Sequence, residues 1–367
     1  MKSDQLRFIE NLNTQVRSLP TLSQLVTEIG LGKTTKSIIE ERLIQWDKAL
    51  VKDSKFYRTQ KGILSNSKNK GLTVKRYLDL ALSFGLCNNI NELVFNTDLG
   101  KVLVYLNKEK SLKNYYLQDS EVIFLTNLLI NSDFDVIILA LTILNKSHEI
   151  SQKKILNIFS TELLNRLKNK QKHSSQSAKN NINEKFRKVK FEWEKPEIYA
   201  EHIVVPRLEW LSQINLIEKN SRSTRTTYQL TKNGINFLQK INYSPNEDFY
   251  EIDSVWINKN SQKAIVENCV QENTFTLWNE LEKGEKTELF GYYIIEAYNL
   301  FSKGSALRVP IFPTLLLAVS NLFRKMNIVA EFEELKLLLK DSFSFDKRIF
   351  SIREAARTNE GYILIQF

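Results

Sequence analysis

The chain is short of the residues on which tight turns, disulfides and metal sites depend. Of its 367 residues only 11 are glycine and 6 are proline. Many-stranded folds use these residues in their turns, so the scarcity favours helices. Its two cysteines, Cys87 and Cys269, lie far apart and form neither a disulfide framework nor a metal-binding pattern. The three histidines, His148, His173 and His202, are isolated from one another, which excludes the spacing of common histidine metal sites.

Long apolar runs are also lacking. The most apolar stretch, residues 122–144, is interrupted by polar residues that include Asn127, Asp133 and Asp135. A membrane-spanning helix needs about 20 consecutive apolar residues. The first residues lack the apolar core of a signal peptide. We therefore expect a cytoplasmic protein with no membrane-spanning segment.

Recognisable catalytic motifs are missing as well. Residues 30–35, Gly-Leu-Gly-Lys-Thr-Thr, lack the first glycine of a phosphate-binding loop and fit better a turn between two helices. The triplet Glu334-Leu335-Lys336 suggests a metal-dependent nuclease, but such a nuclease needs it on a strand after an aspartate, and here it falls in a helical pattern. We predict no catalytic residue, metal or cofactor, and a protein that is not an enzyme.

Apolar residues are nevertheless plentiful enough for packed cores. Hydrophobic residues make up 42% of the chain and aromatic residues 11%, and the length allows about two or three domains. In several segments the apolar residues recur at helical spacing. These segments contain Ile38, Ile39, Leu43 and Trp46, then Val122, Leu125, Leu128 and Leu129, and then Ile155, Ile158, Phe159, Leu163 and Leu167. The prediction is a mainly α fold of the α+β class.

The charge is strongly positive, with a formal net charge of +10 and a pI near 9.3. Such a surplus favours a polyanionic partner, either nucleic acid or an anionic membrane surface. A general lysine bias of an AT-rich genome would produce the same surplus. Residues 168–190 are almost free of acids and poor in apolar residues, which predicts a flexible basic linker between two halves of the chain. A second break is expected near residues 242–248.

One pattern of residues occurs twice. An amphipathic helix ends at a residue that tolerates the left-handed conformation, Gly85 in the first copy and Asn215 in the second. An apolar pair, a polar tip and a second apolar run follow, as expected for two paired strands. Each copy then reads Thr-x-x-Gly, at residues 97–100 and 231–234. The threonine hydroxyl is suited to cap the helix that comes next.

This order of helix, hairpin and Thr-x-x-Gly resembles the winged helix-turn-helix family, especially prokaryotic members with a Leu-Thr-x-x-Gly ending. The resemblance implies tandem winged-helix units joined by helical segments and the basic linker. The first would lie at about residues 60–107 inside a helical domain of residues 1–167, and the second at residues 191–243, after the linker at 168–190. Two unrelated helix-hairpin-helix segments with ordinary caps remain the alternative.

A weaker third copy is expected within a C-terminal domain of residues 244–367, at about residues 305–367. Two helical patterns there precede two strand-like runs, but the Thr-x-x-Gly ending is absent. The second helical pattern carries carboxylates at Glu331, Glu333 and Glu334, which would repel phosphate. We expect this unit to dock on a protein first and to contact DNA, through its hairpin, second.

In the winged-helix resemblance, a recognition helix enters the major groove and the hairpin, or wing, contacts phosphates or the minor groove. The second hairpin is the sharpest candidate because its tip has two guanidinium groups and no acid, although an ordinary solvated tip would look the same. The expected DNA-binding residues are Lys68, Lys70, Thr73, Lys75 and Arg76 in the first unit, Arg207, Arg222, Thr224, Arg225 and Lys232 in the second, and Arg348 and Arg353 in the third.

The arrangement is similar to the tandem winged-helix recognition parts of prokaryotic restriction and anti-phage defence systems. It implies a non-catalytic DNA-binding recognition or adaptor subunit that acts with a separate nuclease, helicase or ATPase. Two other functions stay open. A winged-helix transcriptional regulator would be a dimer on a palindromic site. A docking subunit of a chromosome-handling ATPase complex would bind protein tightly and DNA weakly.

Overall fold

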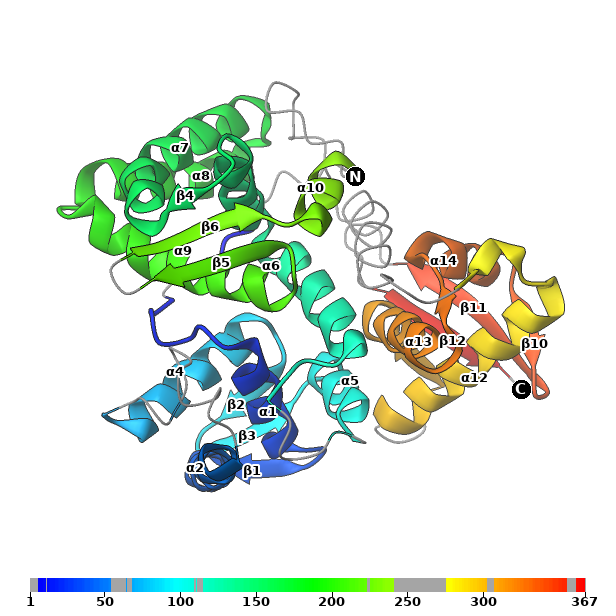
Figure 1. The fold of residues 1–367 in the computed structure, drawn as a ribbon. Helices are drawn as coiled ribbons and strands as arrows, with labels where there is room; N and C mark the ends of the chain where they lie inside the picture. Colours follow the sequence, from blue (N-terminus) through cyan, green and yellow to red (C-terminus); the bar gives the residue numbers. More distant parts are fainter. Residues whose placement is uncertain are drawn as a thin grey trace.

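A computed structural model describes residues 6–10, 12–53, 64, 68–108, 110, 115–222, 225–240, 275–301, 307–354 and 361–366. The fold is mainly helical with small sheets, so the predicted class is confirmed (Figure 1). The elements fall into three units that share one order: a helix and a short strand, then two or three further helices, then a two-stranded hairpin. The break expected near residues 242–248 lies outside the described residues.

Unit 1, residues 19–106, forms the blue and cyan part of Figure 1. In its sheet β1 pairs antiparallel with β3, which pairs with β2. Residues 30–35 connect two helices, as expected, and the last three of them form strand β1. The elements are α1 (Leu19–Ile29), β1 (Lys33–Thr35), α2 (Lys36–Asp53), α4 (Lys70–Ser83), β2 (Cys87–Ile90), β3 (Leu93–Asn96) and α5 (Asp98–Leu106).

Unit 2, residues 119–240, repeats this strand order, with β4 pairing β6 and β6 pairing β5. In the sequence Pro206 is suited to the first position of a helix, but the helix that contains it, α9, starts at Pro196. The elements are α6 (Asp119–Asn145), β4 (Ile150–Ser151), α7 (Gln152–His173), α8 (Gln176–Arg187), a π-helical turn η2 (Lys188–Glu192), α9 (Pro196–Gln213), β5 (Ile217–Arg222), β6 (Arg225–Leu230) and α10 (Lys232–Lys240).

Unit 3, residues 283–366, has the same order with two added strands, one between its second and third helices and one before its hairpin. Its sheet runs β10-β11-β12-β8, so the first strand again pairs with the last strand of the hairpin. A strand before the unit, β7 (Thr276–Leu277), pairs in parallel with β9. The elements are α12 (Lys283–Phe301), β8 (Arg308–Pro310), α13 (Ile311–Met326), β9 (Ile328–Val329), α14 (Phe332–Lys340), β10 (Phe343–Phe345), β11 (Arg348–Glu354) and β12 (Gly361–Gln366).

The Thr-x-x-Gly sequence of unit 1 joins its hairpin to the helix before and the helix after it. Gly85 closes α4 with φ +67°, as predicted. The Thr97 hydroxyl donates to the carbonyl of Gly85 at 2.6 Å and accepts the amide N–H of Gly100 at 3.2 Å, so it caps α5. A Cβ on Gly100 would lie 2.0 Å from the carbonyl oxygen of Leu86, so only glycine lets the helix approach the strand this closely.

Unit 2 reproduces this junction. Asn215 ends α9 with φ +60°. The Thr231 hydroxyl donates to the Asn215 carbonyl at 2.8 Å and accepts the amide of Gly234 at 3.0 Å. A Cβ on Gly234 would lie 2.0 Å from the carbonyl oxygen of Leu216. The two copies predicted from the sequence therefore share their backbone geometry as well as their residue pattern.

Residues 168–190 are helical, so the flexible linker predicted for them is wrong. They form the end of α7, all of α8 and the start of η2. Their few apolar residues are spaced to face inward, and Ile182 and Val189 are buried. Lys170 pairs with Asp135 at 2.6 Å and Lys185 with Glu10 at 2.8 Å. Ion pairing thus places in the structure a segment that its composition alone would leave mobile.

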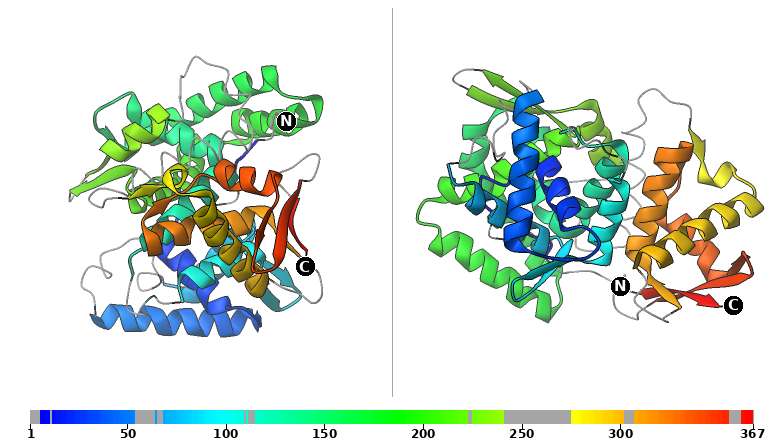
Figure 2. Two further views of the ribbon diagram at one scale, coloured as in Figure 1. Left: turned by 90° about the vertical axis from the view of Figure 1, so that its right-hand side faces the viewer. Right: turned by 90° about the horizontal axis from the view of Figure 1, so that it is seen from below.

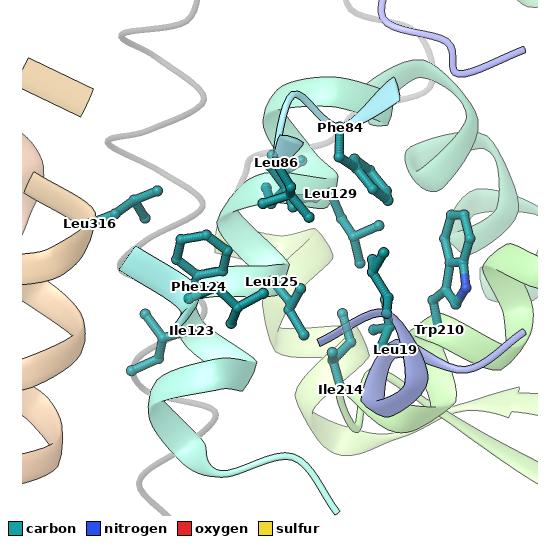
Figure 3. Packing of buried hydrophobic residues seen from close by; sticks show 14 of the residues in the cluster. Leu19, Phe84, Leu86, Ile123, Phe124, Leu125, Leu129, Trp210, Ile214 and Leu316 are labelled. Carbon is teal, nitrogen blue, oxygen red and sulfur yellow. The ribbon is translucent and has the colours of Figure 1, made fainter. Parts of the chain in front are cut away.

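Helix α6 is the central element shared by the three units. It is long and apolar enough to cross a membrane, but 83% of its most apolar window is buried inside the protein, and the core helix of a soluble protein passes the same test. Helix α13 packs on α6 and α5. Figure 3 shows side chains of α6 between unit 3 on one side and units 1 and 2 on the other: Ile123, Phe124, Leu125 and Leu129 lie among Leu316, Phe84, Leu86, Leu19, Trp210 and Ile214.

Candidate nucleic-acid interface

Helix α4 of unit 1 is open on one face, and that face is only weakly basic. Lys68 and Lys75 are exposed, but Asp79 is exposed beside them. Lys70 is partly exposed and pairs with Asp47 at 2.7 Å. The Arg76 guanidinium donates to Asn13 at 2.7 Å. Two of the cations expected to contact DNA are therefore already held by neighbours within the protein.

Thr73 is a correction to the expected DNA contacts. Its side chain is buried, with 1% of its surface exposed. The hydroxyl is 3.1 Å from Gln15 Oε1 and 3.2 Å from the carbonyl of Asn69. Thr73 therefore fixes the start of α4 against the N-terminal segment, because its Cβ points inward at this turn of the helix.

Helix α9, the recognition helix implied for unit 2, is an internal helix. Its second half is buried on all sides, with eight consecutive buried residues, 204–211. The Trp210 indole donates to the carbonyl of Val16 at 2.8 Å, and its ring packs near Phe84 with centroids 5.9 Å apart. Unit 1 and the N-terminal segment thus cover the face that a groove-binding helix would need to expose.

Arg207 is the second correction. It is 0% exposed, and its guanidinium contacts both carboxylate oxygens of Asp133, at 2.5 and 2.7 Å. It also donates to the carbonyls of Ile203 at 2.6 Å and Ile9 at 2.9 Å. Asp133 lies where α6 departs from helical geometry, with φ −138° and ψ 23°. Arg207 therefore holds the N-terminal segment to a bend in α6 and is not available to DNA.

The β5–β6 hairpin, residues 217–230, is the most accessible of the predicted contacts; we call it the basic hairpin. It lies at the margin of the molecule in both views of Figure 2 (green). Arg225 and, at the start of α10, Lys232 are exposed. Arg222 pairs in register with Arg225 across the strands, while its side chain and Thr224 lie outside the described residues. Two arginines are thus adjacent at one hairpin end.

The base of the basic hairpin is fixed by a buried polar cluster. Glu209 of α9 accepts hydrogen bonds from Lys219 at 2.8 Å and from the Tyr228 hydroxyl at 3.2 Å. Burial and the neighbouring Glu209 raise the pKa of Tyr228, which keeps the phenol protonated. Lys219 is therefore engaged in the protein, and the charge offered to a ligand comes from the end of the hairpin.

Two further lysines, which the sequence reading missed, lie beside the basic hairpin. Strand β4 pairs with β6 at Thr227 and Tyr228 and leads directly into α7. Lys153 and Lys154 in the first turn of α7 are exposed. The free N–H groups of a helix start also favour anions. The sequence held one signal for this helix start, Ser151, which caps α7 by accepting the Lys154 amide N–H. The strand that brings Ser151 to the hairpin was not predicted, because it has only two residues.

In unit 3 the predicted contacts lie on its hairpin. Arg353 is exposed, and Arg348 is partly exposed and donates to Asp346 at 2.9 Å. On α14, Glu333 and Glu334 are half-buried at the helix start. Carboxylates therefore occupy the implied recognition helix, and the basic groups lie on the sheet.

The described part of the chain offers neither a three-ligand metal site nor a reactive cysteine. No group of three His, Cys, Asp or Glu side chains there could hold a metal ion. Cys87 is buried, and burial raises the pKa of its thiol to about 12, so it is not a reactive thiolate. Comparisons with protein-family models, with curated proteins and with solved structures gave no match.

Proposed function

We propose that the chain is a non-catalytic DNA-binding subunit that contacts duplex DNA through the basic hairpin and the start of α7. The observation that carries the proposal is the gathering of exposed Arg225, Lys153 and Lys154 around a projecting hairpin whose end also holds Arg222. A hairpin of this kind contacts phosphates or lies in the minor groove.

The unit topology supports the same proposal. Three units in which a helix, a strand and two or three further helices precede a hairpin resemble winged-helix domains, in which the hairpin is one of the two DNA-contacting parts. In unit 2 the other DNA-contacting part, the recognition helix, is not accessible, because Arg207 is buried and α9 is covered. DNA contact is therefore assigned to the hairpin, and a separate nuclease, helicase or ATPase, as in restriction and anti-phage systems, would perform the chemistry.

A docking role is the second candidate, because implied recognition helices are covered in unit 2 and acidic in unit 3. A docking subunit of a chromosome-handling ATPase would present other faces to a protein and bind DNA weakly. A dimeric transcriptional regulator would instead need an open recognition helix, and α4 is the one that offers an exposed face.

The test measures binding of a labelled duplex by fluorescence anisotropy across a salt series. Two phosphate contacts contribute about 2 to the slope of log K against log salt, so Arg222→Glu/Arg225→Glu should flatten the slope by at least that amount. The matched control is Lys48→Glu/Lys340→Glu, which makes the same charge change at exposed helical positions elsewhere. No duplex binding at low salt, or an equal loss in the control, would reject the proposal and favour the docking role.

A further inference from the structure

The outer face of the unit 3 sheet is open to solvent. Residues alternate along each strand, and those that point inward, such as Phe350, Ile363 and Val309, are buried. In both views of Figure 2 the red strand β12 lies at the margin of the molecule. The outward positions are Arg308 and Pro310 on β8, Ser344 on β10, Ile349, Ser351 and Arg353 on β11, and Tyr362, Leu364 and Gln366 on β12.

An aromatic ring lies between two arginines on this face. Tyr362 pairs directly with Arg353 across β11 and β12. On the other side, the Arg308 guanidinium of β8 lies 4.5 Å from the centre of the Tyr362 ring. The ring is 42% exposed, and Ile349 on the same face is 43% exposed. None of the described outward positions carries a carboxylate, so the face offers planar groups and positive charge together.

This combination matches the chemistry of unpaired nucleotides. Unpaired bases stack on aromatic rings and on guanidinium planes, while cations beside them hold the phosphates. Neighbouring strands lie about 4.8 Å apart, so three strands bring the ring and both guanidinium groups within reach of a few consecutive nucleotides. In a regular duplex the base faces are stacked on one another, so no base face is free to stack on the Tyr362 ring.

We propose that the outer face of the unit 3 sheet binds a single-stranded segment of DNA, with a base on Tyr362 and phosphates on Arg308 and Arg353. The site lies on a different unit from the basic hairpin and does not depend on duplex binding there. Together with the duplex binding proposed for the basic hairpin, on which this consequence rests, the site lets the protein bind DNA in which a duplex passes into a single strand.

The test uses the full chain and a fluorescein-labelled oligodeoxythymidine, which cannot form a duplex with itself. Removal of one stacking partner weakens single-strand binding by about 5- to 150-fold, and this is the loss expected for Tyr362→Ala, whereas Tyr362→Phe should bind as the wild type does. Arg308→Gln/Arg353→Gln should lower the salt slope by about 1.4, because each phosphate contact on a single strand contributes about 0.7.

Matched controls lie on the same unit. Tyr292→Ala removes a ring of similar exposure, 47%, from α12, and Lys283→Gln/Lys340→Gln removes two exposed cations from helices. An oligomer with abasic sites should bind wild type and Tyr362→Ala equally. Equal binding of oligodeoxythymidine by wild type and Tyr362→Ala would overturn the proposal, as would equal losses in the controls. If Arg222→Glu/Arg225→Glu loses duplex binding but retains single-strand binding, the unit 3 site is supported as independent of the basic hairpin.

Discussion

At the scale of single residues, the buried ion pair of Arg207 and Asp133 decides how a cationic side chain is used. In the sequence Arg207 follows a proline and looks like the first exposed residue of a helix. In the structure its charge is neutralised by a carboxylate from α6 and by carbonyls from the N-terminal segment and from its own helix. These acceptors lie 74 and 198 residues away, or on the preceding turn. A local pattern contains no sign of the distant ones, so the buried role could not be predicted.

Arg207→Met should destabilise the protein without acting on DNA contacts. Loss of one partner leaves the Asp133 charge buried and uncompensated, which costs about 3–5 kcal/mol. Urea unfolding measures this change in free energy. Lys75→Met, at an exposed position, should stay within about 0.5 kcal/mol. If Arg207→Met keeps wild-type stability but loses duplex binding, the assignment of a structural role is wrong.

Asp135 should make stability depend on pH. Burial alone would raise its pKa, but the charges of Lys170 and Arg166 outweigh burial and lower it. An acid with a lowered pKa stabilises the fold above its unfolded-state pKa of about 4, and that contribution is lost as pH falls through the folded-state pKa. Asp135→Asn should therefore be less stable at pH 7 by about 3–5 kcal/mol.

This difference between Asp135→Asn and the wild type should shrink as the pH is lowered below about 4, measured by urea unfolding at each pH. Asp346→Asn is the control, because Asp346 is 61% exposed in its pair with Arg348 and should change stability little at any pH. A difference for Asp135→Asn that stays constant down to acid pH would contradict the pKa assignment.

At the scale of elements, the junction of hairpin and helix could be predicted from the sequence. Strands β1 and β4, which complete the sheets of units 1 and 2, could not. The left-handed residues Gly85 and Asn215 and the Thr-x-x-Gly caps are local signals, and the structure places them as predicted. Strand β1 has three residues and β4 has two. Strands this short form only by pairing with β3 and β6, so they show no periodic pattern in the local sequence.

The two junction glycines should be intolerant of a methyl group. In Gly100→Ala and Gly234→Ala the new Cβ would lie 2.0 Å from a strand carbonyl oxygen, and relief of such a clash costs about 1–3 kcal/mol. Gly284→Ala is the matched control, since nothing lies within 4 Å of a Cβ at that helical position. Thermal unfolding should show lower midpoints for the first two and an equal or higher midpoint for the control. Wild-type midpoints for both junction variants would contradict the close approach.

At the scale of the whole molecule, α6 packs against all three units, so we expect the units to unfold together. Its residues face unit 1, unit 2 and unit 3 (Figure 3), and side-chain contacts between units 1 and 3 add to it. The Tyr105 hydroxyl donates to Glu296 at 2.8 Å, and Arg324 donates to the carbonyl of Leu106 at 3.1 Å. From the sequence we predict separate domains on a linker, because a hydrophobic pattern shows that a face is buried without showing which partner buries it.

Phe124→Ala tests this cooperativity. The side chain is 0% exposed at the junction of units, and its truncation should cost about 3–5 kcal/mol. Because α6 serves all three units, unfolding followed by far-ultraviolet circular dichroism and by tryptophan fluorescence should stay coincident in the variant as in the wild type. Leu337→Ala, at a position that is 57% exposed, is the control and should change stability little. Separate transitions for the two signals in the wild type would show that the units unfold independently.

The hydrogen bond between Arg207 and the N-terminal segment also has a consequence for the order of events during synthesis. The carbonyl of Ile9 accepts its hydrogen bond from Arg207, 198 residues further along the chain. At about 5–20 residues per second, a ribosome needs roughly 10–40 s to make that stretch. Once Ile9 has emerged from the ribosome, it therefore remains without its guanidinium donor until Arg207 has been made. The apolar side chains of unit 1 that α9 covers, such as Phe84, stay without that cover until α9 has been made.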